Sequence, residues 1–200
     1  INRYDVDFKI AKTVNQIINK STGNFIYIFK RGCHFPYENN YPKSAQIWKP
    51  VFEGKKVKNA KQDELVNSYD NSMHYNLNKF FKLLVGDYKT SLKNTTIIYV
   101  GDHGESLLED GKSFGHGGKS KYQAMVPLFL IGLNIKINER YKASHANILP
   151  TVLDLMKYPS TQIKFPYSIS LLKASEKDNL PRKYILPNLA TPEIFEFDLH

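Results

Sequence analysis

The feature that most constrains the fold is an uninterrupted run of β-forming apolar side chains, Thr95–Val100. Such a run, without alternating polar residues, is typical of a strand buried on both faces of a sheet. Two further apolar runs, Phe25–Phe29 and Val126–Ile131, have the same character. Helical spacing of apolar side chains predicts three amphipathic helices, at Asp5–Lys20, Asp63–Val85 and Ser144–Met156.

The alternation of these helices and strands predicts the α/β class, with a mainly parallel sheet sandwiched by helices. We expect residues 1–158 to form the body of one domain and residues 159–200 to be a covering segment of the same domain. Periodicity is lost after Pro159, where only a short strand at Tyr184–Leu186 is predicted. Residues 38–60 are expected to be a long irregular loop.

Composition narrows the possible partners. The formal net charge of +9 predicts attraction to anionic partners. The single cysteine, Cys33, excludes an intrachain disulfide and a cysteine-based zinc site. Nucleic-acid binding is not expected, because no helix-turn-helix, zinc-finger or aromatic–basic motif accompanies the charge. The cluster of Lys55, Lys56, Lys58 and Lys61 is interpreted as a solvated face.

Candidate chemistry follows the predicted strands, because ligands of open α/β sheets bind beyond the carboxyl ends of strands. Strand Thr95–Val100 leads directly into Gly101-Asp102-His103-Gly104. Asp102 and His103 offer an oxygen and a nitrogen ligand, a pair that suits Zn²⁺ or a similar divalent ion. His116 stands among glycines that permit a tight loop around something small, and His34 follows the run Phe25–Phe29.

Together these segments resemble one family. Tyr99–Leu107, with Gly115-His116-Gly117, resembles the signature of phosphoethanolamine transferases, which belong to the sulfatase and alkaline phosphatase superfamily. Gly32–Tyr37 followed by Tyr41-Pro42 is similar to their Gly-x-His-x-Pro segment and to lipoteichoic acid synthases of the same superfamily. Two further matches, on predicted helices, are Tyr69–Ser72 and Ser144–Leu155. The resemblance covers about residues 5–158.

The resemblance implies an alkaline phosphatase-like fold, of which this chain would be the carboxy-terminal part, and a set of site residues. Asp102 and His103 match the metal-ligand pair, for Zn²⁺ or alternatively Mn²⁺. His116 and His34 match catalytic, substrate-binding histidines that contact the transferred phosphate. The family's threonine nucleophile and a further acidic ligand lie upstream of the Gly-x-His segment, and the residues before Gly32 offer no counterpart. We therefore expect the nucleophile upstream of this chain, and the chain alone to be inactive.

The activity implied by the resemblance is transfer of phosphoethanolamine from a phospholipid to a glycolipid or glycan, through a phospho-enzyme. It places the chain at the extracytoplasmic face of the bacterial inner membrane, in the periplasm, associated with the membrane through an amino-terminal segment outside this sequence. Phosphoglycerol transfer, phosphodiester hydrolysis and a non-catalytic binding module lacking the nucleophile are the alternatives. Strict sulfatase activity is not expected, because Cys33 is not followed by the x-Pro-x-Arg pattern.

Overall fold

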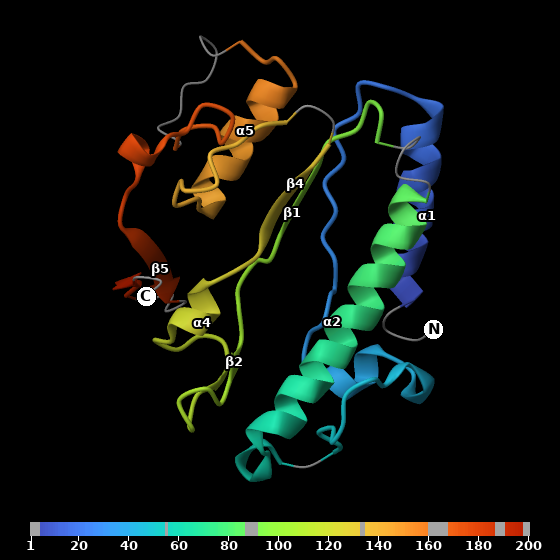
Figure 1. The fold of residues 1–200 in the computed structure, drawn as a ribbon, viewed down its shortest axis with the longest axis vertical. Coiled ribbons are helices and arrows are strands. Elements are labelled where there is room, and N and C mark those ends of the chain that lie inside the picture. Colours follow the sequence, from blue (N-terminus) through green and yellow to red (C-terminus); the bar gives the residue numbers. More distant parts are fainter. Residues whose placement is uncertain are drawn as a thin grey trace. The chain divides into compact units, whose positions relative to one another are not determined.

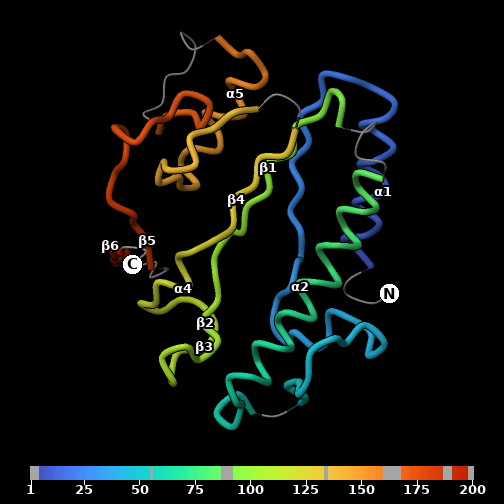
Figure 2. Tube along the Cα trace, viewed as in Figure 1, coloured from blue at the N-terminus to red at the C-terminus, as the bar shows by residue number. Residues whose placement is uncertain are grey.

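The computed structural model describes residues 5–54, 56–86, 92–132, 135–159, 168–186 and 191–197. The chain divides into two compact units, which are described separately. The first comprises residues 1–95 and 106–114, and the second comprises residues 96–105 and 115–200. Figures 1 and 2 trace both units from blue to red along the chain.

Two long helices, α1 (Asp5–Lys20) and α2 (Gln62–Val85), pack against each other in the first unit (Figure 1). The ring of Phe8 meets the ring of Tyr75 edge-on, with centroids 5.8 Å apart. Nearer the other end of the pair, the Asn15 side-chain amide donates to the Leu84 carbonyl at 2.9 Å. The bounds confirm both helices predicted from apolar spacing, to within one residue.

The segment before α2 is irregular, as predicted, but it is tied to that helix. It contains three short 3₁₀ helices: η1 (Tyr37–Asn40), η2 (Lys43–Ala45) and η3 (Val57–Asn59). The backbone amide of Phe52 donates to the Glu64 carbonyl at 3.1 Å and to the Ser68 hydroxyl at 2.7 Å. The cyan trace of this segment runs beside the amino-terminal half of α2 in Figure 1.

The predicted buried strand Phe25–Phe29 is wrong. This segment pairs with no strand in the part of the chain that the structure describes. Its alternate side chains Phe25, Tyr27 and Phe29 are 60%, 78% and 71% exposed. Its β-forming composition is real, but a strand also needs a hydrogen-bonding neighbour, and none is described beside it.

A small ladder that the sequence did not reveal joins β2 (Ser106–Leu107) and β3 (Phe114–Gly115). Between them the Leu108 amide donates to the Ser113 carbonyl at 2.9 Å. In the first unit the Phe114 ring packs edge-on against Phe35, with ring centroids 5.1 Å apart.

The second unit contains an antiparallel pair, β1 (Ile97–Val100) and β4 (Leu128–Ile131). The strands are those predicted at Thr95–Val100 and Val126–Ile131, shortened by two residues each. Their pairing differs from the expected parallel arrangement: Tyr99 lies opposite Phe129, and the two rings stack with centroids 6.1 Å apart.

Shorter elements are also described in this unit. They are α4 (Lys121–Ala124), η4 (His145–Asn147), α5 (Ile148–Leu155) and η6 (Glu176–Asp178). The predicted helix Ser144–Met156 is confirmed as η4 followed by α5, with Ser144 as its N-cap. A small core of Tyr141, Leu171 and Ala174 packs against Leu128 and Leu130 of β4.

The final hairpin pairs β5 (Arg182–Leu186) with β6 (Glu193–Phe197) in antiparallel register. It confirms the short strand predicted at Tyr184–Leu186, and β6 was not predicted. Among the helices that the structure describes, none combines the length and apolar character needed to cross a bilayer.

Candidate phosphate and metal site

The site is built on the turn that leaves β1. The Gly104 amide donates to the Gln123 carbonyl at 2.8 Å, so the turn is anchored to α4. A side chain at Gly104 has no room, because a Cβ there would overlap the Tyr122 carbonyl oxygen. Glycine at this position is therefore required by close backbone approach.

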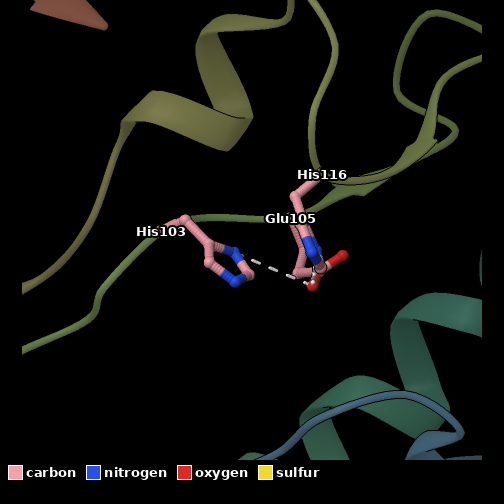
Figure 3. A group of neighbouring side chains, drawn as sticks. All are labelled: His103, Glu105 and His116. Carbon is pink, nitrogen blue, oxygen red and sulfur yellow. Dashed lines mark hydrogen bonds and ion pairs between the residues drawn. The ribbon is translucent and has the colours of Figure 1, made fainter. Parts of the chain in front are cut away.

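Three side chains converge just after this turn: His103, Glu105 and His116 (Figure 3). One ligand atom from each lies within 4.8 Å of the others. The two imidazole rings have centroids 3.9 Å apart, and His116 Nδ1 lies 2.9 Å from Glu105 Oε1. Because a carboxylate only accepts, this His116 nitrogen donates. Glu105 is the most buried of the three, with its side chain 14% exposed.

Asp102 lies outside this cluster, although it was predicted to pair with His103. Its side chain is 72% exposed, and its Oδ2 is 3.9 Å from His103 Nε2. Its other oxygen accepts the His103 backbone amide at 3.0 Å. His103 Nδ1 is 3.0 Å from the Gly104 carbonyl and so donates to it. In a neutral His103 ring this leaves Nε2, on the Asp102 side, as the nitrogen with a lone pair.

Glu105 is the functional candidate that the sequence analysis missed. His103 and Glu105 are two positions apart in the segment between β1 and β2, and both side chains reach the cluster. This spacing of two positions was the sequence signal that could have identified Glu105. The loop through positive-φ glycines Gly115 and Gly117 then carries His116 to the same place, as the glycine setting indicated.

His145 also lies beside the site. Its Nε2 is 2.7 Å from the Gly101 carbonyl and therefore donates to it. Gly101 immediately precedes Asp102, so His145 fixes the backbone from which the predicted metal pair projects.

His34 belongs to the first unit, whereas the cluster belongs to the second. Its side chain is exposed, and its Nδ1 lies 2.6 Å from the Phe35 carbonyl. Its own carbonyl accepts a hydrogen bond from the Asn40 side-chain amide at 2.7 Å. Burial raises the pKa of the neighbouring Cys33 thiol, which disfavours the thiolate and a nucleophilic role.

The backbone leading to His34 is held by one buried carboxylate. Asp7, on α1, accepts hydrogen bonds from the Arg31 and Gly32 amides at 3.1 and 3.0 Å. It also forms an ion pair with Lys30 at 3.1 Å. Gly32 takes a φ of +63°, a conformation that favours glycine.

Chemically, the cluster offers two imidazoles, one shielded carboxylate and an adjacent exposed carboxylate. Nitrogen and oxygen donors of this kind suit Zn²⁺, and imidazoles beside glycine amides also suit phosphate oxygens.

Solved structures share this fold. The C-terminal periplasmic domain of phosphoethanolamine transferase EptC from Campylobacter jejuni matches with a TM-score of 0.61 and 25% identity, over 76% of this chain and 53% of that one. The soluble domain of lipooligosaccharide phosphoethanolamine transferase A from Neisseria meningitidis matches with a TM-score of 0.55 and 22% identity, over 75% of this chain and 50% of that one. The predicted alkaline phosphatase-like α/β class is thereby confirmed.

Curated sequences agree. Phosphoethanolamine transferase EptA of Helicobacter pylori is 31% identical over 58% of this chain and 22% of its own length. Phosphatidylethanolamine transferase Mcr-2 of Escherichia coli is 29% identical over 73% of this chain and 29% of its own length. The chain thus spans less than a third of these relatives. The sequence model of the sulfatase family matches residues 3–158, well over half of the chain, so the chain belongs to the sulfatase family.

Proposed function

We propose that this chain serves the transfer of phosphoethanolamine from a phospholipid to a glycolipid or glycan acceptor, at the extracytoplasmic face of the bacterial inner membrane. The observation that carries the proposal is the convergence of His103, Glu105 and His116 in a chain of the sulfatase family. Relatives named as phosphoethanolamine transferases support this choice over the other phosphoryl chemistries of the superfamily.

A divalent metal, Zn²⁺ or alternatively Mn²⁺, fits the turn after β1. Two ligands of one tetrahedral zinc ion lie roughly 3.3 Å apart, given bonds of about 2 Å. His103 Nε2 and Asp102 Oδ2 are 3.9 Å apart, close to that spacing. Nδ1 of His103 is already engaged by the Gly104 carbonyl, the kind of outer contact that orients a metal-binding histidine. When bound, the metal would supply Lewis-acid polarisation of a phosphoryl oxygen and activation of a hydroxyl nucleophile.

His116 binds the phosphate in this proposal, and Glu105 orients it. With Nδ1 of His116 donating to Glu105, Nε2 is left to donate to a phosphoryl oxygen. A ring that donates from both nitrogens is a cation, and the shielded Glu105 carboxylate provides its counter-charge. Charge building up on the transferred group is thereby stabilised. His34 is retained as a second phosphate-binding histidine on the strength of the resemblance alone.

The experiment compares matched carboxylate variants by calorimetric zinc binding and by ³¹P NMR of O-phosphoethanolamine. Asp102→Asn should lower zinc affinity by at least tenfold. Mutating a residue that only contacts a metal ligand already lowers metal affinity by about 10- to 100-fold, and Asp102 is a proposed ligand itself. Glu105→Gln should leave zinc affinity nearly unchanged but weaken O-phosphoethanolamine binding by about tenfold, the value of one charge-assisted hydrogen bond. Glu53→Gln, at an exposed glutamate of the first unit, is the control.

The reverse pattern would contradict the assignment. If Glu105→Gln abolishes zinc binding while Asp102→Asn does not, the ion sits among His103, Glu105 and His116. Intact mass after incubation with zinc and phosphatidylethanolamine tests the nucleophile. A phosphoethanolamine adduct on this chain would show that the nucleophile lies within residues 1–200. Equal binding of glycerol 1-phosphate would favour the phosphoglycerol alternative.

A further inference from the structure

We propose that residues 43–61, called here the basic loop, form a docking surface for an anionic phospholipid bilayer. Ile47 and Trp48 would enter the headgroup region, and the loop's lysines would contact lipid phosphates. This surface lies in the first unit and uses none of the residues of the proposed phosphate and metal site. The docking proposal can therefore be tested independently of the proposed transfer reaction.

The apolar tip is held outward by a buried side chain of α2. Ile47 and Trp48 are 56% and 40% exposed. Asn71, fully buried, accepts their backbone amides at 2.7 and 3.1 Å and donates to the Trp48 carbonyl at 2.9 Å. With the backbone fixed on the helix side, the Ile47 side chain is presented to solvent. The Trp48 ring meets the His74 ring of α2 edge-on, with centroids 5.7 Å apart, and keeps the rest of its surface exposed.

The loop follows one face of α2, so its parts form one surface. Its backbone meets Asn71, then Asn67 through the Pro50 carbonyl at 2.9 Å, then Glu64 through the Phe52 amide at 3.1 Å. These helix positions are spaced by three and four residues, the spacing of a single helical stripe. Lys61, at the start of α2, therefore lies about 15 Å from the level of Asn71.

Charge is concentrated on this loop. It holds six lysines and one carboxylate, Glu53, so it carries +5 of the chain's net +9. Five of these lysines lie within the described residues and all are exposed: Lys43, Lys49, Lys56, Lys58 and Lys61. In the described part of the chain, the side chains of Lys43, Lys49, Lys56 and Lys58 form no ion pair. No carboxylate among the described residues neutralises these four charges.

A partly exposed tryptophan and isoleucine in a loop rich in exposed lysines fit a lipid interface better than bulk water or a protein surface. Tryptophan favours the headgroup level of a bilayer, and each lysine near an anionic leaflet adds roughly 1 kcal/mol, a factor of about five in binding. The combination predicts binding that needs both anionic lipid and low to moderate salt. Nucleic acid would engage the same lysines, so it serves as the competing ligand in the test.

Trp48 makes the test direct, because it is the chain's single tryptophan. The chain is titrated with vesicles of phosphatidylcholine containing about 30% phosphatidylglycerol, and with pure phosphatidylcholine vesicles, at 50 and 500 mM salt. We expect a blue shift of Trp48 emission and quenching by lipids brominated near the headgroup, with anionic vesicles at low salt only. Co-sedimentation gives the binding constant independently.

Matched variants locate the surface. Lys49→Gln/Lys58→Gln should weaken binding about 25-fold. Ile47→Ser should weaken it about tenfold, the equivalent of roughly two buried methylene groups. The control Lys20→Gln/Lys82→Gln removes the same charge from exposed positions on α1 and α2. Because Lys82 lies about 16 Å along the helix from Asn71, beyond one Debye length, the control should change binding less than threefold.

Several outcomes would overturn the proposal. These are binding to vesicles without a change in Trp48 emission, equal losses in the lysine variant and its control, and no preference for anionic lipid. A Trp48 response to single-stranded DNA tighter than to vesicles would assign the surface to nucleic acid instead. Circular dichroism confirms that each variant is folded, and Glu105→Gln should bind vesicles like the unaltered chain whatever its effect on phosphate binding.

Discussion

Removing the Asp7 carboxylate should destabilise the first unit more than most single substitutions. Asp7 is 2% exposed, and its partner Lys30 has a side chain only 13% exposed. The Asp7→Ala variant leaves the Lys30 ammonium and the Arg31 and Gly32 amides without their acceptor. Breaking a buried pair from one side costs about 3–5 kcal/mol, and so little exposure means little solvent screening. We expect the free energy of unfolding to fall by about 4 kcal/mol, a large share of the roughly 5–15 kcal/mol available to a domain.

Urea denaturation followed by Trp48 emission measures this loss. Asp7→Asn keeps one acceptor oxygen and should cost about half as much, because the amide oxygen can still accept a backbone hydrogen bond. Asp5→Ala, in the same helical turn, should cost about 0.3–1 kcal/mol through the helix dipole alone. The double variant Asp7→Ala/Lys30→Met should recover at least 1 kcal/mol relative to Asp7→Ala, since it removes the unpaired charge.

The reasoning would be refuted if Asp7→Ala and Asp5→Ala cost the same. It would also be refuted if adding Lys30→Met made the protein less stable than Asp7→Ala alone. Either result would mean that Lys30 is satisfied without Asp7, for instance through the Phe80 ring, whose centroid is 4.0 Å from its ammonium.

Three further outcomes are expected. Asn71→Ala should lower the free energy of unfolding by about 2–3 kcal/mol and raise acrylamide quenching of Trp48, since three backbone hydrogen bonds are lost. Hydrogen bonds from Ser113 and Lys112 hold the pKa of Asp110 at about 2, below the ordinary 3.8. The contribution of these hydrogen bonds to the free energy of unfolding is therefore complete above pH 3.8 and is lost as pH falls through about 2. The Ser113 amide shift in NMR, followed against pH, should therefore change at about pH 2. Lys157→Gly should raise Tm by about 3 °C, because exposed Lys157 holds φ +56° at the end of α5, where glycine is less strained.

The helices were predictable because their signal is local. Apolar side chains such as Phe8, Ala11 and Val14 recur at helical spacing in α1, and all three are buried. The segment Phe25–Phe29 shows the limit of such reasoning, because aromatic and β-branched composition fixes an extended preference but not a partner. For β1 and β4, composition identified the strands, but their antiparallel pairing depends on the connection between them, which carries no comparable pattern.

The sequence predicted His103 and His116 as separate site residues, but it did not predict that their side chains meet in one cluster with Glu105. His103 and His116 are thirteen positions apart, and the glycines around His116 indicated a wrapped loop without showing where it returns. Glu105 was not predicted, because it directly follows the Asp102-His103-Gly104 motif and the pattern assigns it no role of its own. It nevertheless stands only two positions after His103. The roles of Asp102, His103, His34 and His116 stay predictions until zinc and phosphate binding are measured.

Gly104 meets main-chain atoms: its amide donates to the Gln123 carbonyl, and the carbonyl oxygens of Tyr122 and Met125 lie where a Cβ would stand, so the contact does not depend on the side chains of Tyr122 and Met125. Both side chains are themselves exposed, at 39% and 41%. Tyr122 and Met125 can therefore be exchanged for engineering purposes, for example to attach a fluorophore or a cross-linker, provided that the backbone is preserved. Gln123 cannot, because its buried side chain accepts the Gly118 amide at 2.6 Å. The position of the turn after β1 depends on the backbone of α4, so α4 supports the site without taking part in its chemistry.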